Sequence, residues 1–309
     1  MSYRIGSLNC LNFGVGYNKN IQTFADIIIN EQFDIVALQE IKRKEAVDMI
    51  LRRLPNYWNG EADNEVHDYA FIWNTRRIKL VETPTPNGLR TYCPRIYKQY
   101  RIDRRLGQTD LLREPYFARF TPCGTAGGLP FEIRIINTHI RFNKSRLSED
   151  DTDDNSLGAI AMRKNEFSVL ARTIYAKEAD KRYGNNMPAY TILLGDFNLN
   201  LPDSEAGSPY LEEVIEISDG GNISKRVVTK QSELTTLKTS EQAEMDVSEN
   251  SSYSNNYDHF TYDANRFISV RTTCQKIDSV QKYCGGDFER HKKEVSDHVP
   301  IVMELNLIK

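Results

Sequence analysis

The chain has 309 residues, of which 39 % are hydrophobic and 27 % are charged, and its formal net charge is -3. This composition is typical of a globular protein and argues against a disordered chain, and no apolar run approaches the roughly 18 to 20 residues of a membrane helix. The length allows one large domain or two ordinary ones. Because the net charge is slightly negative, a local basic patch or a bound cation would have to attract any polyanion.

Strand-like and helix-like segments alternate along the chain, which predicts a mixed α and β fold. The strands between residues 69 and 138 have short connections, which favours antiparallel pairing. Polar segments at 145–155 and 239–256 are typical of solvated loops, and no repeat or linker divides the chain. Expected strands are 3–8, 35–39, 69–73, 78–82, 116–120, 131–138, 190–194, 257–261, 267–273 and 299–307, and expected helices are 21–31, 44–54 and 159–177.

The N-terminus and the cysteines indicate a reducing compartment. Met1-Ser2-Tyr3-Arg4 leads directly into a strand-like segment without the apolar stretch of a signal peptide, so we expect a cytoplasmic protein unless the sequence begins after a processing site. The cysteines lack metal-binding spacing and fit reduced thiols, although a bond between Cys274 and Cys284 stays open. The five cysteines are Cys10, Cys93, Cys123, Cys274 and Cys284.

Polar side chains follow several of the expected strands, at the point where each strand ends. In layered folds such strand ends converge on one rim, where ligands usually bind. Oxygen ligands with few histidines favour Mg²⁺ or Mn²⁺ over zinc, and Glu40 is the best single metal candidate. These groups suit phosphoester hydrolysis, although each motif alone has an ordinary explanation as a turn or a buried polar residue. The set is Asn9, Glu40, His139, Asp196, Asn198, Asp258, Asp297 and His298.

Six short motifs occur in one order along the whole chain. They are Ser7-Leu8-Asn9-Cys10-Leu11-Asn12, Leu38-Gln39-Glu40, Asn137-Thr138-His139, Gly195-Asp196-Phe197-Asn198, Tyr257-Asp258-His259 and Ser296-Asp297-His298. Together they resemble the endonuclease/exonuclease/phosphatase superfamily, which includes deoxyribonuclease I, abasic-site endonucleases of the exonuclease III class and inositol polyphosphate 5-phosphatases. The resemblance implies a single domain over residues 1–309. Its fold class would be α/β (α+β), a four-layered sandwich of two packed mixed β-sheets with helices on the outer faces.

The resemblance also implies a metal site and phosphate contacts. Glu40 would be the principal metal ligand, with Asn9 and Asp297 close to the cation or the scissile phosphate. Asp196 and Asn198 would position or activate water and contact phosphate.

Acid/base roles follow from the same resemblance. His298, oriented by Asp258, would form an acid/base dyad, with Asp196 as the rival base. His139 would be a second imidazole that stabilises the pentavalent transition state, and Asp68 is a candidate partner for it.

The deoxyribonuclease I branch is the most similar in its motifs. Leu112-Arg113-Glu114-Pro115 resembles the Arg-Glu-Pro strand entry of that branch, which makes Arg113 a candidate phosphate contact, and Asn12 is another. The 5-phosphatase signature Trp-x-Gly-Asp-x-Asn-Tyr-Arg is replaced here by the segment that starts Leu193-Leu194-Gly195-Asp196, which counts against inositide specificity.

A basic stretch with tyrosines has the composition of a phosphate-tracking surface, although a solvated hairpin explains it equally well. The leading prediction is a phosphodiesterase dependent on Mg²⁺ or Mn²⁺ that hydrolyses nucleic acid, as a DNA endonuclease of low sequence specificity. The alternatives are a phosphatase or phosphodiesterase for a small phosphoester, such as a nucleotide or phospholipid headgroup, and a catalytically silent binding module. The stretch contains Arg90, Tyr92, Arg95, Tyr97, Lys98, Tyr100, Arg101, Arg104, Arg105 and Arg113.

Overall fold

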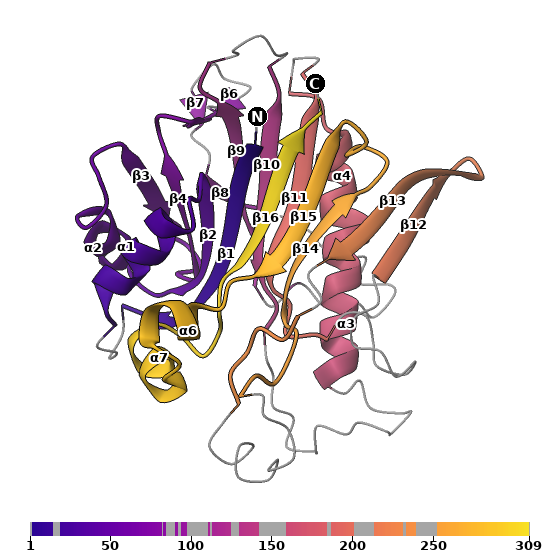
Figure 1. The fold of residues 1–309 in the computed structure, drawn as a ribbon. Coiled ribbons are helices and arrows are strands. Elements are labelled where there is room, and N and C mark those ends of the chain that lie inside the picture. Colours follow the sequence, from indigo (N-terminus) through magenta and orange to yellow (C-terminus); the bar gives the residue numbers. More distant parts are fainter. Residues whose placement is uncertain are drawn as a thin grey trace.

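The computed structural model describes residues 2–14, 19–81, 83–84, 90–91, 94–97, 111, 113–124, 130–141, 159–183, 187–200, 213–230, 233–238 and 252–308. In this part of the chain two β-sheets pack face to face, and helices lie on the outer faces (Figure 1). No described helix is long and apolar enough to cross a membrane.

The first sheet has six strands, and its only parallel pair within the described residues is β1 with β2. Its strand order is β15 (Val270–Lys276), β16 (Ile301–Leu307), β1 (Ser2–Phe13), β2 (Ile35–Ile41), β4 (Tyr69–Asn74) and β3 (Trp58–Ala62).

The second sheet has eight strands, with a parallel pair of β10 and β11 at its centre. The order is β12 (Glu213–Asp219), β13 (Asn222–Lys230), β14 (Asp258–Asp263), β11 (Ala189–Asp196), β10 (Glu132–His139), β9 (Tyr116–Pro122) and β5 (Ile78–Leu80), and β8 (Arg95–Ile96) also pairs with β9. A separate small pair joins β6 (Thr83–Pro84) to β7 (Arg90–Thr91).

Alternate side chains of each sheet enter different apolar cores, as the two-residue period of a strand requires. Ile35 and Ile135 belong to the core between the sheets, whereas Val36 packs under α1 (Ile21–Asn30) and α2 (Lys44–Leu51). Leu193 packs instead against the helix on the other side, formed by α3 (Ala159–Val169), the π-helical segment η2 (Leu170–Tyr175) and α4 (Ala176–Asp180). These three cores confirm the expected four-layered α/β sandwich of two mixed sheets.

Several expected elements differ in extent or in partners. The strands expected at 69–73 and 78–82 belong to different sheets, because the turn at 75–77 carries the chain from the first sheet to the second. The strand expected at 267–273 starts only at Val270, after a turn. Sequence patterns did not predict β3, the β12–β13 hairpin, α6 (Ser279–Cys284) or α7 (Phe288–Glu294).

The open question of a disulfide is settled for the described cysteines. No disulfide bond joins Cys274 to Cys284, and Cys10 and Cys123 form none either, whereas Cys93 lies outside the described residues. Cys274 lies on β15 and Cys284 is buried at the end of α6, so the two thiols occupy separate layers. The polar segment 145–155 also lies outside the described residues, as does 239–251.

Candidate active site

The two parallel strand pairs end at the same place, one from each sheet. β2 and β10 are joined across the sheet interface by buried amides, since Gln39 Nε2 donates to Asn137 Oδ1 at 2.7 Å and Asn137 Nδ2 donates to the Leu38 carbonyl at 2.9 Å. This junction brings Glu40, the next residue of β2, towards His139, which ends β10. Their closest side-chain atoms, Oε1 and Nε2, lie 3.8 Å apart.

Asn9 of β1 links the carboxylates of the two sheets. Its Nδ2 donates to Glu40 Oε1 at 3.1 Å and to Asp196 Oδ2 at 2.9 Å, while its Oδ1 accepts from the Leu11 amide at 3.0 Å. The amide nitrogen therefore faces the carboxylates and the oxygen faces the backbone. In this structure Asn9 holds the two acids in position.

Glu40 sits in an unusual backbone conformation at the end of β2. Its φ is +58°, in the left-handed region that non-glycine residues seldom occupy, and such outliers often mark functional sites. Its Oε2 accepts from the Asn12 amide at 2.8 Å. Burial raises the pKa of Glu40, but His139 and the Asn9 hydrogen bond outweigh it and lower the pKa below its usual value. Glu40 is thus ionised at neutral pH.

Asp196 is the buried centre of the site. Gly195 precedes it with a φ of +134°, and a Cβ at that residue would lie only 1.9 Å from the Thr138 carbonyl oxygen of β10, so only glycine fits there. Burial and the neighbouring Asp258 raise the pKa of Asp196, whereas His298 and His139 lower it, and the net shift is upward. A raised pKa makes this carboxylate more basic than an ordinary aspartate.

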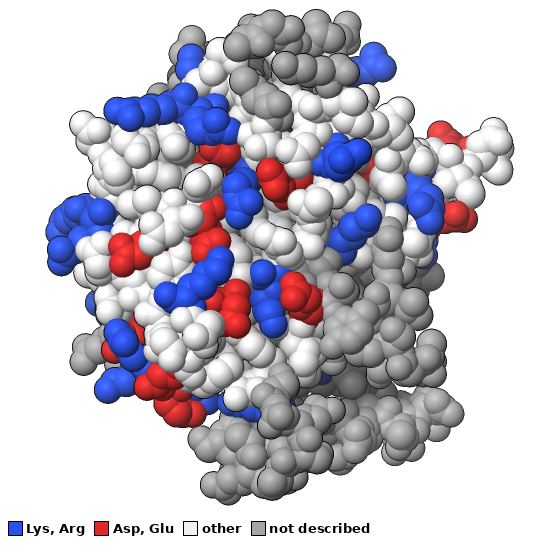
Figure 2. Space-filling view, viewed as in Figure 1, with Lys and Arg blue, Asp and Glu red and all other residues white. Residues whose placement is uncertain are grey.

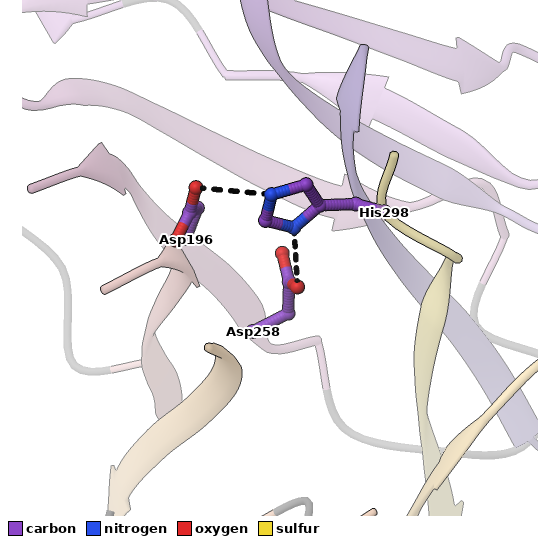
Figure 3. A group of neighbouring side chains, drawn as sticks. All are labelled: Asp196, Asp258 and His298. Carbon is purple, nitrogen blue, oxygen red and sulfur yellow. Dashed lines mark hydrogen bonds and ion pairs between the residues drawn. The ribbon is translucent and has the colours of Figure 1, made fainter. Parts of the chain in front are cut away.

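His298 bridges two buried carboxylates, as Figure 3 shows. Its Nδ1 lies 2.8 Å from Asp258 Oδ2 at the start of β14, and its Nε2 lies 3.7 Å from Asp196 Oδ2 at the end of β11. Burial lowers the pKa of His298, but Asp258 and Asp196 together raise it well above its usual value. The structure therefore favours the imidazolium form at neutral pH.

His139 forms the second aspartate-histidine pair, on the other side of Asp196. Its Nδ1 lies 2.8 Å from Asp68 Oδ2, and its Nε2 lies 3.7 Å from Asp196 Oδ2. Arg113 Nη1 lies 3.0 Å from the same Nε2. The two histidines thus each pair with an aspartate through Nδ1 and lie at the same distance from Asp196 Oδ2 through Nε2.

Asp68, which immediately precedes β4, pairs with three positive or polar groups. Besides His139 it contacts Lys42 Nζ through Oδ1, and Arg113 Nη1 lies 3.3 Å from Oδ2. Burial opposes ionisation, but the hydrogen bond and charge of His139 and the charge of Arg113 lower the pKa of Asp68 to about 2. Asp68 is therefore a permanent anion that orients His139 and holds two cations at the edge of the site.

The remaining expected site residues lie around this cluster with different contacts. Asn198, with a φ of +50°, donates from Nδ2 to the Ile140 carbonyl at 2.8 Å and to Asp196 Oδ2 at 3.3 Å, so it supports Asp196. Asn12 reaches Glu40 through its backbone amide. Asp297 stands next to His298, but its carboxylate makes no hydrogen bond or ion pair to Glu40 among the described residues; Ser296 Oγ lies 3.4 Å from it.

Three contributors were not identified from the sequence. Tyr69 Oη accepts from the His139 amide at 3.1 Å, and Arg163 Nη1 donates to the Asn198 carbonyl at 2.7 Å. Lys42 follows Glu40 by two residues, and that spacing is the one local signal that could have indicated it. Tyr69 and Arg163 reach the site only through the packing of distant segments.

The donor chemistry of the site fits a hard divalent cation. Glu40 and Asp196 both accept a hydrogen bond from Asn9 Nδ2, so two carboxylates lie side by side, and Mg²⁺ or Mn²⁺ prefers such oxygen ligands. Asp196, Asp258 and His298 also offer ligand atoms within 4.8 Å of one another. His298 Nδ1 is already bonded to Asp258, however, so this second group fits an acid/base pair better than a metal site.

The basic stretch predicted as a phosphate-tracking surface falls mostly outside the described residues. Of its members, only Arg95, Tyr97 and Arg113 have described side chains, and Arg113 alone contacts the candidate site, at His139. Figure 2 shows basic and acidic side chains intermixed on the face seen in Figure 1. Among the described residues that face therefore presents no continuous basic patch.

Comparisons with known proteins identify relatives by structure alone, since no protein-family model and no curated protein sequence matches the chain. Humanized TDP2 of D. rerio, with 14 mutations, is 16 % identical over 99 % of both chains, with a TM-score of 0.56. An endonuclease/exonuclease/phosphatase family protein from Bacteroides thetaiotaomicron is 15 % identical over 99 % of this chain and 98 % of that one, with a TM-score of 0.53.

A third structure, D. rerio TDP2 complexed with a single strand DNA product, is 14 % identical over 99 % of both chains, with a TM-score of 0.52. At such low identities the likeness establishes the fold. The resemblance expected from the six motifs is thus confirmed at this level: the chain has the fold of the endonuclease/exonuclease/phosphatase proteins.

Proposed function

We propose that this protein is a divalent-metal-dependent phosphodiesterase that hydrolyses nucleic acid, as a DNA endonuclease of low sequence specificity. One observation carries the proposal: two imidazoles, each paired with its own aspartate, flank the buried carboxylate of Asp196 at 3.7 Å. Phosphodiester hydrolysis needs a base for water, an acid for the leaving oxygen and positive charge around the phosphate. The similar structure that contains a single strand DNA product supports the choice of nucleic acid.

Asp196 and His298 divide the acid and base roles in this proposal. Asp196 accepts the proton of the attacking water, because its raised pKa makes the carboxylate basic. His298 carries a proton that it can donate to the leaving oxygen, since Asp258 and Asp196 raise its pKa. Environments that separate the protonation states of neighbouring groups are typical of such acid/base pairs. Of the two candidate bases, we therefore assign the role to Asp196.

His139 and Arg113 stabilise negative charge on the phosphoryl oxygens. The Arg113 side chain is 24 % exposed and lies against His139, so it can reach a phosphate at the mouth of the site. Asp68 keeps the imidazole oriented, and Lys42 adds a second positive charge there.

Glu40 is the carboxylate that would hold the cation, with Asp297 in the adjacent loop, and this leaves Asp196, its neighbour across Asn9, to act on the water. When bound, Mg²⁺ or Mn²⁺ supplies positive charge that neutralises phosphoryl oxygens. Asn9 keeps the carboxylates of Glu40 and Asp196 together, whether or not its own oxygen also binds the cation. The proposal treats residues 1–309 as one domain, because both sheets contribute to the site.

Plasmid nicking by the purified protein tests the proposal. Nicking that needs Mg²⁺ or Mn²⁺, is stopped by EDTA and falls at least a hundredfold in Glu40→Gln, Asp196→Asn and His298→Ala would support it. Asp219→Asn, at the exposed end of β12, is a matched control that should retain full activity. Undiminished nicking by His298→Ala would refute the mechanism.

A substrate panel tests the specificity. Supercoiled plasmid, linear duplex, abasic-site duplex and RNA should show cleavage of supercoiled plasmid without a preferred sequence. Activity confined to nucleotides or phospholipid headgroups would replace the proposal with a small-phosphoester hydrolase. Absence of all hydrolysis together with retained DNA binding would indicate a silent binding module.

A further inference from the structure

A polar cavity lies at the end of the sandwich opposite to the catalytic cluster. Its volume is about 630 Å³, and it is formed where α4 ends and β11 begins. In Figure 1 this is the upper end of the view, near the α4 label. β11 starts beside the cavity at Ala189 and ends at Asp196, so at about 3.3 Å per residue the cavity is roughly 23 Å from the catalytic carboxylate. The two sites are therefore separate.

Positive charge predominates in the lining of this cavity. Arg134, Lys181, Arg182 and Arg266 line it together with a single carboxylate, that of Asp180. Asp180 is already neutralised, because Lys225 Nζ lies 2.5 Å from its Oδ2 and Arg266 Nη2 contacts its Oδ1. The cavity thus has an excess of cations over anions, which favours a negatively charged ligand.

Arg134 supplies a rigid donor at the base of the cavity. It is only 2 % exposed, its Nε donates to Glu132 at 3.0 Å, and its Nη1 donates to the Glu178 and Lys181 carbonyls at 2.9 and 2.7 Å. These bonds cap the C-terminal end of α4 and fix the plane of the guanidinium. Its Nη2 has no acceptor among the described residues, so one donor of a buried arginine remains available.

Two further cations of the lining have no carboxylate partner. Lys181 Nζ lies 4.6 Å from the centre of the Tyr183 ring and forms no ion pair in the described part of the chain. Arg182 is exposed and makes neither an ion pair nor a side-chain hydrogen bond to any described residue. Burial lowers the pKa of Lys181 and Glu178 raises it, but the nearby Arg95 lowers it further, which is consistent with surplus positive charge.

We propose that this cavity binds a small phosphate-bearing anion, of the size of pyrophosphate or a nucleotide. The fixed guanidinium of Arg134 would donate to a phosphate oxygen, and Lys181 and Arg182 would close around the same group. Arginine suits this role because its planar fork matches the geometry of phosphate oxygens. A volume of about 630 Å³ lies within the range of small-molecule sites, and a preorganised donor loses little entropy on binding.

Calorimetric titration with pyrophosphate, in EDTA, tests this site. Lys181→Gln/Arg182→Gln removes the two unpaired cations without removing the helix cap, and should weaken binding about tenfold or more. Arg52→Gln/Arg53→Gln, a pair of exposed consecutive arginines after α2, is the matched control and should bind as the wild type does. Glu40→Gln should also bind normally, because Glu40 belongs to the opposite end of the sandwich.

Three results would overturn the proposal: no binding of pyrophosphate at millimolar concentration, equal binding by Lys181→Gln/Arg182→Gln, or loss of binding in Glu40→Gln. The last would place the anion at the catalytic site. Titrations with inorganic phosphate and AMP identify the ligand class. Equal affinity for the two supports recognition of the phosphate group alone, whereas tighter binding of AMP supports a nucleotide.

Discussion

Replacing Asp258 with asparagine removes the buried charge that orients His298 while keeping nearly the same side-chain shape. In the native site Asp258 Oδ2 lies 2.8 Å from His298 Nδ1, and the two side chains are 0 % and 9 % exposed. Solvent therefore cannot replace the lost interaction. An asparagine amide that donates to Nδ1 leaves the imidazole neutral with its proton on Nε2, and a neutral imidazole is a much weaker acid than the imidazolium.

The expected loss of activity follows from the strength of that contact. A hydrogen bond to a charged group contributes about 1.5–3 kcal/mol, and the loss of the imidazolium form costs more, so the nicking rate should fall between about 10² and 10⁴-fold. The pKa of His298 should also fall, because Asp258 is the largest influence that raises it. If the protonated imidazole is the active form, the alkaline limb of the rate profile moves to lower pH.

Single-turnover plasmid nicking from pH 5 to 9 measures both effects, with circular dichroism and thermal melting to verify folding. Asp219→Asn, at an exposed aspartate that ends β12, serves as the matched control. A folded Asp258→Asn protein that nicks within threefold of the wild-type rate would refute the orienting role. An unmoved alkaline limb would refute the protonated form of His298 as the active one.

Three further predictions concern stability and are measured by urea unfolding. Gly195→Ala should lower the free energy of unfolding by about 4 kcal/mol or more, because the added Cβ would lie 1.9 Å from the Thr138 carbonyl oxygen. A variant whose free energy of unfolding stays close to that of the wild type would contradict this prediction. Asp68→Asn should lower the free energy of unfolding by about 2.5 kcal/mol at pH 7, because the pKa of Asp68 is lowered to about 2 in the folded protein. The difference between wild type and variant should vanish as the pH falls from 3.8 through 2, and a difference that does not depend on pH would disprove the linkage. Burial lowers the pKa of His291 to about 4 in the folded protein, so on acidification this histidine is protonated in the unfolded chain before it is protonated in the folded one. Between pH 7 and 5 the free energy of unfolding of the wild type should therefore fall by about 2 kcal/mol more than that of His291→Asn. An equal fall in both proteins would contradict the assignment.

Local patterns identified the strands and the polar groups that end them. The apolar run before Glu40 and the run before Asp196 both form buried strands. These strands could be predicted because each apolar run and the polar residue that ends it lie within a few neighbouring residues. The ordered motifs were sufficient to predict the four-layered sandwich. Segments with weaker patterns, such as β3 and the β12–β13 hairpin, were not predicted, since only Ala62 of β3 is buried and β13 begins with three exposed residues.

Tertiary structure decided how these groups are paired. That Asp68 orients His139, and that Asn9 turns its nitrogen to Glu40 and Asp196, depends on contacts between residues as many as 187 positions apart, which no local period encodes. The protonation states follow from the same packing, because burial and neighbouring charge shift each pKa only after the two sheets have met. By itself the sequence determined which chemical groups stand at the strand ends, and only the tertiary structure decided which of them share a proton.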